Sequence, residues 1–204
     1  MSQKLASTLK NMVLSLLLIS AVMAAALGFV YSVTKEPIEK ANKAKEIQAI
    51  KEVLPAFDND PTAEMKSIDG LTFYPATKDG KSVGVAVKTF TDKGFSGRFD
   101  LMVGFNPDGS VNNTVVLDQK ETPGLGTKMK EPKFKDQFNK LNIATLKDKQ
   151  LKVKKDGGNI DAITAATITS RAFCDGVQKA YDLFMKNYAV AQTDSTSNVE
   201  GGSK

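Results

Sequence analysis

The chain has 204 residues, with no histidine, no tryptophan and one cysteine, so it lacks the imidazole ligands of haem and zinc sites and cannot hold an iron–sulfur cluster or an internal disulfide. The net charge is +5, from 28 Lys and Arg against 23 Asp and Glu, and no basic stripe with interleaved aromatic residues is present, so we expect no nucleic-acid partner. Redox chemistry in such a chain requires an organic cofactor.

The N-terminal region has the pattern of a membrane anchor. A short segment, residues 1–11, precedes a stretch without charged residues over 12–33. About 20 apolar residues span the hydrocarbon core of a bilayer as a helix, so we predict one transmembrane helix in contact with lipid. A cleavable signal peptide is the alternative, because Ala24-Ala25-Ala26 resembles a processing site. The apolar stretch exceeds the ~7–15 residues of a signal-peptide core, which favours the anchor.

The charges flanking this stretch bear on its orientation. Two lysines precede it and four follow it closely: Lys4 and Lys10, then Lys35, Lys40, Lys43 and Lys45. The lysine count alone favours a cytoplasmic position for the domain that follows.

A second helical pattern covers 34–55 and predicts a helix that links the anchor to the domain. Apolar residues recur at helical spacing along one side, and Pro37 lies near the start, where proline is tolerated. The apolar positions are Ile38, Ala41, Ala44, Ile47, Ile50 and Leu54.

Residues 56–190 have the pattern of a single α+β domain. Alternating apolar residues predict strands over 82–87, 99–103 and 111–117, with Val83, Val85 and Val87 on one face of the first. Turn pairs lie before the first strand and after the second, at Asp79-Gly80 and Asp108-Gly109. We therefore predict a mainly antiparallel sheet of meander type with flanking helices.

Two glycine-containing turns follow. Gly94-Phe95-Ser96-Gly97 is predicted to be a turn that enters the second strand. In the run Glu121-Thr122-Pro123-Gly124-Leu125-Gly126-Thr127-Lys128, Pro-Gly is a tight-turn pair. The second glycine, Gly126, keeps the backbone open to close approach.

The last part of the domain is predicted to be helical at both ends. Pro132 opens a short helix bearing Phe134, Phe138 and Leu141, and short strands at 151–153 and 160–162 flank an Asp156-Gly157-Gly158-Asn159 turn. A long helix follows with five apolar residues on one face, and Cys174 within it is expected to be a small buried residue. That face carries Phe173, Val177, Ala180, Tyr181 and Phe184, and a disordered tail is expected over 191–204.

The stretch before the long helix gathers hydroxyl groups and small side chains. It reads Asp161-Ala162-Ile163-Thr164-Ala165-Ala166-Thr167-Ile168-Thr169-Ser170-Arg171. Thr169 or Ser170 is a natural N-cap, and the positive end of a helix can hold a phosphate. Taken alone, the stretch is better explained as a threonine-rich helix cap.

This stretch resembles the flavinylation motif of membrane-anchored FMN-binding subunits. The family pattern is Asp, two variable residues, Ser or Thr, usually Gly, then Ala and Thr, which here is Asp161 to Thr167. The run Glu-Thr-Pro-Gly-Leu-Gly is identical to a loop of the G subunit of the Rnf ion-translocating electron transport complex and of its relative, the C subunit of the sodium-pumping quinone reductase. Both motifs stand in the family's order after one membrane span, and the resemblance covers nearly the whole chain.

The resemblance implies that Thr167 carries FMN through a phosphoester bond, attached by a separate flavin transferase. Ala165 replaces the usual glycine, which is acceptable if that position avoids positive φ. The chain would be an electron carrier, without independent catalytic residues and without a metal site. Its partners would be the other membrane and peripheral subunits of a complex that passes electrons between ferredoxin and NAD and couples the flow to ion movement. The domain would lie outside the cytoplasm of a bacterial inner membrane, against the lysine count, and we adopt this orientation.

We assign expected roles to the remaining motif residues. Thr164 and backbone N–H groups near Thr169 and Ser170 would bind the phosphate, and the small Ala165 and Ala166 would allow close approach. Glu121 and Thr122 would contact ribityl hydroxyls or ring edges, Gly124 and Gly126 would keep the loop open, and Leu125 would pack on the flavin ring.

Two further residues have equally plain explanations. Lys128 would raise the local positive potential, or it is a solvated lysine. Asp161 would be part of the signal read by the transferase, with Mg²⁺ bound during attachment, or it is an ordinary aspartate at the end of a strand.

Two other functions remain as alternatives. The C subunit of a sodium-translocating NADH:quinone reductase is typically longer than this chain, which favours the G subunit of the Rnf complex. A membrane-tethered binding or scaffold module without cofactor is the alternative from a different class.

Overall fold

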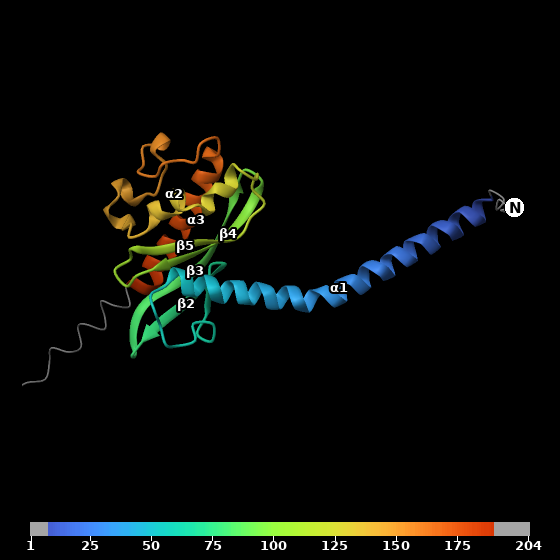
Figure 1. Ribbon diagram of the computed structural model, residues 1–204, viewed down its shortest axis with the longest axis horizontal. Helices are drawn as coiled ribbons and strands as arrows, with labels where there is room; N and C mark the ends of the chain where they lie inside the picture. The colour runs from blue at the N-terminus through green and yellow to red at the C-terminus, as the bar shows by residue number, and fades with distance from the viewer. Residues whose placement is uncertain (1–7, 190–204) are drawn as a thin grey trace, which may run out of the picture. The chain divides into compact units, whose positions relative to one another are not determined.

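The computed structural model describes residues 8–189 (Figure 1). The predicted tail at 191–204 and the first seven residues of the predicted N-terminal segment lie outside the described residues. The chain divides into two units between Lys45 and Glu46. The first unit is the helical N-terminal part, and the second contains the sheet and the remaining helices.

The N-terminal helix, α1, is continuous from Leu9 to Val53. It is long and apolar enough to cross a membrane, and its most apolar section is not buried in protein. The predicted helices at 12–33 and 34–55 are therefore parts of one helix. The expectation that Pro37 lies near a helix start is wrong, because Pro37 lies inside α1. Inside a helix, proline removes the hydrogen bond that its N–H would have donated, and its ring crowds the carbonyl group four residues earlier.

The domain is built on a five-stranded antiparallel sheet in which every strand pairs with the next along the chain. This confirms the predicted meander and its three predicted strands. The first two strands are not among the predicted ones, and the second contains Pro75 opposite Val85. The strands are β1 (Lys66–Ile68), β2 (Leu71–Lys78), β3 (Lys81–Gly94), β4 (Gly97–Phe105) and β5 (Val111–Asp118).

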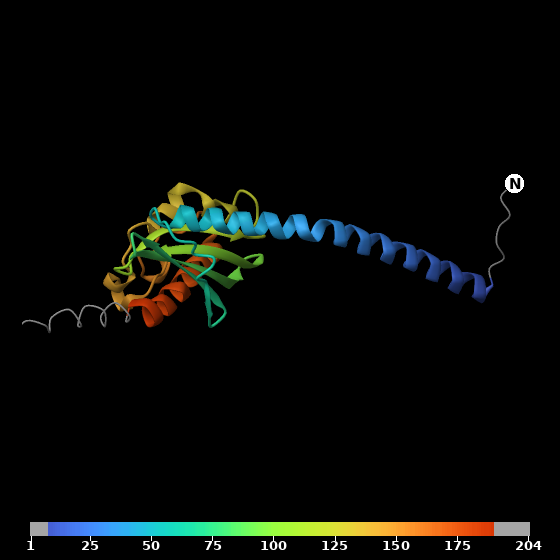
Figure 2. The same ribbon diagram turned by 90° about the horizontal axis from the view of Figure 1, so that it is seen from below.

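The long C-terminal helix, α3, runs from Thr167 to Phe184 and covers one face of the sheet (Figure 2). A short π-helical stretch, Met185–Ala189, follows α3. The predicted apolar face of α3 is confirmed, since its five residues are buried in the larger core cluster: Phe173, Val177, Ala180, Tyr181 and Phe184. Phe184 stacks on Phe105 of β4 at 4.8 Å between ring centroids, and Phe173 meets Phe134 edge-on at 5.2 Å. Burying each such ring is worth about 1.5–3 kcal/mol.

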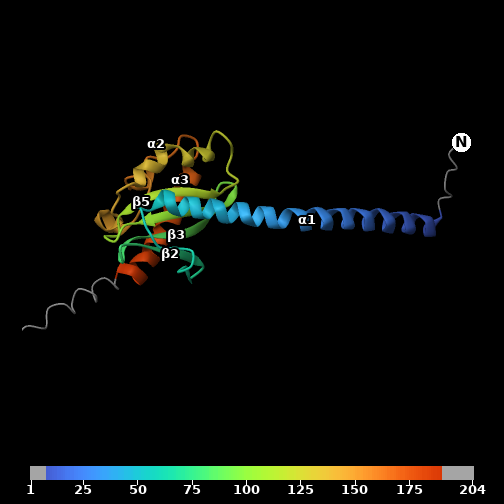
Figure 3. The ribbon, with the colours of Figure 1, turned by 60° about the horizontal axis from the view of Figure 1, so that its bottom comes forward.

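The other face of the sheet is covered by the end of α1 (Figure 3). Ala49, Ile50, Val53 and Leu54 form a second core cluster with sheet residues that point away from α3. The sheet residues of this cluster are Tyr74, Ala76, Ala86, Met102 and Leu117. The sheet therefore has an apolar layer on each face, one under α3 and one under the last turns of α1.

The prediction that Val83 shares a face with Val85 and Val87 is wrong. The β2–β3 register shifts at this point, since Ala76 pairs with Gly84 and Thr77 with Ser82. Val83 is left unpaired by this bulge and packs on the α1 side, whereas Val85 and Val87 lie in the cluster under α3. A bulge moves the following side chains to the opposite face, because side chains alternate along a strand.

Between β5 and α3 the chain makes short helical turns over the edge of the core. The predicted helix at Pro132 is confirmed, with Phe134 and Phe138 buried. The predicted strands at 151–153 and 160–162 are wrong, because only a single bridge joins Val153 to Ile160. Leu151, Val153 and Ile160 pack into the core instead. The turns are η1 (Gly126–Lys130), α2 (Pro132–Lys135), η2 (Asp136–Phe138), η3 (Ile143–Thr145), η4 (Lys147–Lys149) and η5 (Lys154–Asp156).

Polar contacts fix the end of α1 to the sheet. The carbonyl oxygens of Glu52 and Val53 accept hydrogen bonds from the Asn113 and Asn112 side chains, at 3.1 and 2.8 Å. These bonds satisfy carbonyl groups that a helix end leaves without partners. Gly104 of β4 lies so close that a Cβ there would overlap the Val53 carbonyl oxygen.

About two turns earlier in α1, Glu46 joins the helix to two strands. It accepts a hydrogen bond from the Tyr74 hydroxyl and pairs with Lys88 at 3.2 Å. Burial, together with the hydrogen bond to Glu46, raises the pKa of Tyr74.

The substitution Gly104→Ala is expected to destabilise the domain by about 1–3 kcal/mol, because the added methyl group has no room against α1. Thermal unfolding of the full chain in detergent, followed by circular dichroism, measures this. Ser82→Thr is the matched control, since it adds a methyl group at an exposed position of the same sheet and is expected to change stability by less than ~0.5 kcal/mol. Equal unfolding temperatures for the Gly104 variant and the wild type would contradict this packing.

Candidate functional site

A hollow of about 310 Å³ opens where three segments meet at the start of α3. The segments are the β3–β4 turn, the loop after β5 and the first turn of α3. This volume is within the range of small-molecule sites. The lining residues are Phe95, Glu121, Thr122, Leu125, Gly126, Ala165, Ala166, Thr167, Ile168 and Thr169.

The helix begins earlier than the sequence indicated. We predicted Thr169 or Ser170 as the N-cap, but α3 starts at Thr167 and the capping position is Ala166, whose side chain makes no cap hydrogen bond. The Ser170 N–H donates to the Ala166 carbonyl at 3.0 Å. Within the described part of the chain the N–H groups of Thr167, Ile168 and Thr169 have no acceptor. The positive end of the helix therefore faces the hollow with open donors.

The Ser170 side chain has a structural role and does not line the hollow. Its hydroxyl accepts a hydrogen bond from the Ile163 N–H at 2.9 Å and donates to the Ala166 carbonyl at 3.0 Å, and the residue is fully buried. Ser170 thus closes the Ile163–Ala166 turn onto the helix. We expected backbone N–H groups near Thr169 and Ser170 to bind the phosphate. The N–H groups that are free to do so are those of Thr167, Ile168 and Thr169, because the Ser170 N–H is bonded to Ala166.

Ala165 occupies a conformation that we did not expect. We predicted that alanine is tolerated if this position avoids positive φ, yet φ of Ala165 is 61°. A non-glycine residue in the left-handed region costs about 1–2 kcal/mol. Glycine would remove this cost, which gives a physical reason for the usual glycine of the motif.

The loop after β5 contains the tight turn predicted for Pro123-Gly124. The Leu125 N–H donates to the Thr122 carbonyl at 3.1 Å, and φ of Gly124 is 75°. Proline followed by a left-handed glycine is typical of a type II turn. The Thr127 hydroxyl accepts from the Gly124 N–H at 2.9 Å. Thr122 and Leu125 consequently reach the hollow, whereas Gly124 lies outside its lining.

Glu121 is buried, with 4% of its surface exposed, and connects the three segments. One carboxylate oxygen accepts from the Ser96 N–H at 3.1 Å, and the other accepts from the Thr169 hydroxyl at 2.8 Å. Gly94 and Gly126 lie against the carboxylate, where an added Cβ would be 2.6 Å from one of its oxygens. The bulk of any other side chain at these two glycines would displace Glu121.

Three apolar side chains around the hollow are unusually exposed. Phe95, Leu125 and Ile168 are 67%, 39% and 48% exposed, and each comes from a different segment. We predicted Leu125 as a site residue but not Phe95 or Ile168. Two features of the sequence could have indicated them: Phe95 is an aromatic residue in a turn between two glycines, and Ile168 is an apolar residue within a run of hydroxyl-bearing residues.

Residues 94–182, which include all three segments, match the family model of the FMN-binding domain. The G subunit of the ion-translocating oxidoreductase complex of Shewanella oneidensis is 34% identical over 179 residues, with 79% of this chain and 84% of that protein covered. The corresponding protein of Stutzerimonas stutzeri is 32% identical over 190 residues, with 89% and 82% covered. The chain belongs to this G-subunit family. The match to the Shewanella piezotolerans protein is 40% identical but spans 54% of this chain and 53% of that one.

Among solved structures, NqrC of Shewanella oneidensis resembles the chain with a TM-score of 0.48 at 22% identity. The alignment covers 71% of this chain and 70% of that one.

Three other predicted site residues of this family member lie away from the Thr167 hollow. Lys128, Asp161 and Thr164 line a smaller hollow of about 190 Å³ beside α2. Asp161 is exposed and pairs with Lys154 at 2.8 Å. The Gln137 side chain holds the Asp161 backbone, since it accepts from its N–H at 2.7 Å and donates to its carbonyl at 3.2 Å. Sequence reasoning missed Gln137, because its contact crosses 24 residues.

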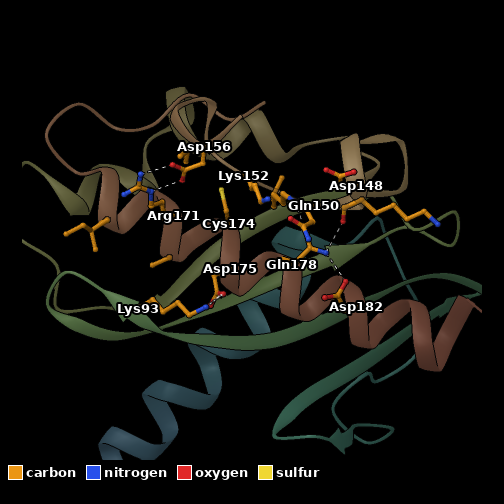
Figure 4. A pocket seen from close by; sticks show the side chains of 15 residues that line it. Lys93, Asp148, Gln150, Lys152, Asp156, Arg171, Cys174, Asp175, Gln178 and Asp182 are labelled. Atoms are coloured by element: carbon orange, nitrogen blue, oxygen red, sulfur yellow. Dashed lines mark hydrogen bonds and ion pairs between the residues drawn. The ribbon is translucent and has the colours of Figure 1, made fainter. Parts of the chain in front are cut away.

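A larger cleft of about 790 Å³ runs along the exposed side of α3 (Figure 4). Four of its charged groups form two ion pairs. Arg171 forms two hydrogen bonds to Asp156 at 2.7 Å, and Lys93 pairs with Asp175. Cys174 lies at the base of the cleft, and burial raises the pKa of its thiol to about 12, so the thiol is a poor nucleophile, as expected for a packing residue. This surface differs from the Thr167 hollow, where the first N–H groups of α3 have no acceptor among the described residues and three apolar side chains are exposed.

The substitution Ala165→Gly is expected to stabilise the domain by about 0.5–1 kcal/mol, because relief of the left-handed strain outweighs the greater freedom of the unfolded chain. Ala166→Gly is the matched control. Its φ is −136° and its methyl group is buried, so we expect a loss of about 1 kcal/mol. Chemical denaturation of both variants measures the difference, and a loss of stability in Ala165→Gly would contradict the observed turn.

Proposed function

We propose that this chain is the electron-carrying subunit of a membrane-bound, ion-translocating ferredoxin:NAD oxidoreductase complex. It would relay electrons through an FMN attached by a phosphoester to Thr167. The observation that carries the proposal is the position of Thr167. Its hydroxyl stands at the first residue of α3, inside a hollow that combines open N–H donors with exposed apolar side chains.

The phosphate end of FMN fits the helix start. The N–H groups of Thr167, Ile168 and Thr169 have no acceptor in the described chain, and the helix adds positive partial charge at the same end. Ala165 and Ala166 present only methyl groups, so a phosphate can come close to the backbone. A phosphodiester formed on the Thr167 hydroxyl would keep its negative charge where these donors stabilise it.

The flat ring of FMN fits the apolar side chains. Phe95, Leu125 and Ile168 expose apolar surface to solvent, and a flavin ring would cover it. Thr122 is an uncharged polar residue of the loop that lines the same hollow. The flavin supplies the redox chemistry when it is bound, and the protein supplies position and electrostatics. Because a tethered ring cannot dissociate, the protein can exchange electrons without losing its cofactor.

The remaining features support the membrane context. The apolar part of α1 would anchor the chain in the bacterial inner membrane, with the domain on the periplasmic side. The curated relatives are named as subunits of an ion-translocating oxidoreductase complex, so we propose the other subunits of such a complex as partners. A flavin transferase would act during maturation, and the exposed Asp161 is available for it to recognise.

The substitution Thr167→Val is expected to abolish covalent FMN, because it removes the hydroxyl and keeps the shape of the side chain. Intact-mass measurement of the chain co-produced with a flavin transferase should show one FMN less one water on the wild type and none on the variant. Thr145→Val is the matched control, because Thr145 is an exposed threonine outside both the motif and the lining of the Thr167 hollow. It should retain the FMN mass. Covalent flavin on Thr167→Val would show that the wrong hydroxyl has been assigned.

Labelling of a single cysteine tests the orientation. In a Cys174→Ala background, Lys66→Cys places a thiol on the exposed edge strand β1. A membrane-impermeant maleimide added to spheroplasts should label this thiol, since the domain lies outside the cytoplasm. A permeant maleimide gives the total amount of reactive thiol. Labelling only after lysis would place the domain in the cytoplasm, as the lysine count suggests.

A further inference from the structure

Glu121 is the one charged side chain among the described residues that line the Thr167 hollow. It is 4% exposed, so water screens its charge poorly. Its two hydrogen-bond partners, the Ser96 N–H and the Thr169 hydroxyl, both donate to it. A carboxylate surrounded by donors alone matches the ionised form, which only accepts hydrogen bonds.

Two glycines let the backbone pack directly against the Glu121 carboxylate. A Cβ at either Gly94 or Gly126 would lie 2.6 Å from a carboxylate oxygen of Glu121. The fold thus holds a negative charge in the wall of a hollow whose other described lining residues are neutral. An apolar residue could fill this space without needing hydrogen-bond donors. The buried charge therefore calls for a functional explanation.

We propose that Glu121 is a positioning and tuning residue whose negative charge lowers the reduction potential of the flavin held at Thr167. This inference rests on the proposed function. One-electron reduction adds one electron, and one negative charge, to the ring when no proton accompanies it. A fixed negative charge nearby raises the free energy of that reduced form, and the low effective dielectric of a buried site strengthens the effect. A proton taken up from solvent with the electron would cancel part of it.

Glu121 also fixes the three segments that carry the apolar side chains. Its bonds reach Ser96, next to Phe95, and Thr169, next to Ile168, while its own chain continues to Leu125. Loss of the residue would therefore disturb both charge and geometry. The test must separate these two effects.

The decisive variant is Glu121→Gln, which keeps the size and an acceptor for the Ser96 N–H while removing the charge. Its carboxamide can donate to the Thr169 oxygen, so the connection between the segments is kept. The full chain, loaded with FMN by a transferase and purified in detergent, is titrated by spectroelectrochemistry with mediator dyes at one mildly alkaline pH. We expect the equilibrium constant for one-electron reduction to rise about tenfold, equal to ~59 mV towards positive potential.

Two variants serve as controls. Glu131→Gln makes the same change in net charge at an exposed residue outside the hollow, and it should leave the potential unchanged. Thr169→Val keeps the charge of Glu121 and removes one of its two donors. It should lower the unfolding temperature while the reduction equilibrium stays within about twofold of the wild type, since screening of the charge is little changed.

Intact mass confirms one FMN on each chain before titration, so failure of attachment is distinguished from failure of this inference. A loaded Glu121→Gln chain with the wild-type potential would overturn the proposal. A shift in Thr169→Val as large as that in Glu121→Gln would also overturn it, because geometry would then account for the effect. If Glu121→Gln alone yields too little folded chain, the same comparison is made in the Ala165→Gly background.

Discussion

The site depends on the contact between a buried carboxylate and two distant segments. Glu121 accepts hydrogen bonds from the backbone of Ser96 and the hydroxyl of Thr169, which are 25 and 48 residues away in the chain. These bonds bring the β3–β4 turn, the loop after β5 and the first turn of α3 to one place. The close approach explains the glycines at 94 and 126, since a Cβ at either would meet the carboxylate. The Glu-Thr-Pro-Gly-Leu-Gly run is therefore a structural unit, in which the glutamate joins the walls of the hollow and the tight turn presents Leu125.

The sheet connects this site to the end of the apolar N-terminal helix α1. The end of α1 packs on one face and α3 on the other, and β4 contacts both. Gly104 admits the end of α1, and Leu101 of the same strand lies against Gly176 of α3, where an added Cβ would be 3.0 Å away. The strand that packs on the end of α1 thus also supports the helix that begins at Thr167. A sheet packed between two apolar layers is rigid, which suits the proposed role of holding a cofactor at a fixed place.

Local patterns in the sequence predicted much of this fold, and contacts distant in sequence account for most of what they missed. The meander and the apolar face of α3 follow from periodicity, and both are confirmed. The unpredicted strand β2 contains Pro75, which normally argues against a strand interior. The left-handed Ala165 could not be predicted, because alanine prefers other conformations and only the closed turn beside Ser170 imposes this one. The motif stretch indicated Thr167 as the site, but the exposed Phe95 and the partners of Glu121 follow only from the tertiary structure.

The central claim is that the hydroxyl of Thr167 carries the flavin. Peptide mapping of the full chain, co-produced with a flavin transferase and digested with trypsin, tests this most directly. The tryptic peptide 156–171 contains Thr164, Thr167, Thr169 and Ser170, so fragmentation distinguishes four hydroxyls within one peptide. The account predicts one FMN less one water on Thr167 and none on the other three. An unmodified peptide, or a flavin on any other residue, would contradict it.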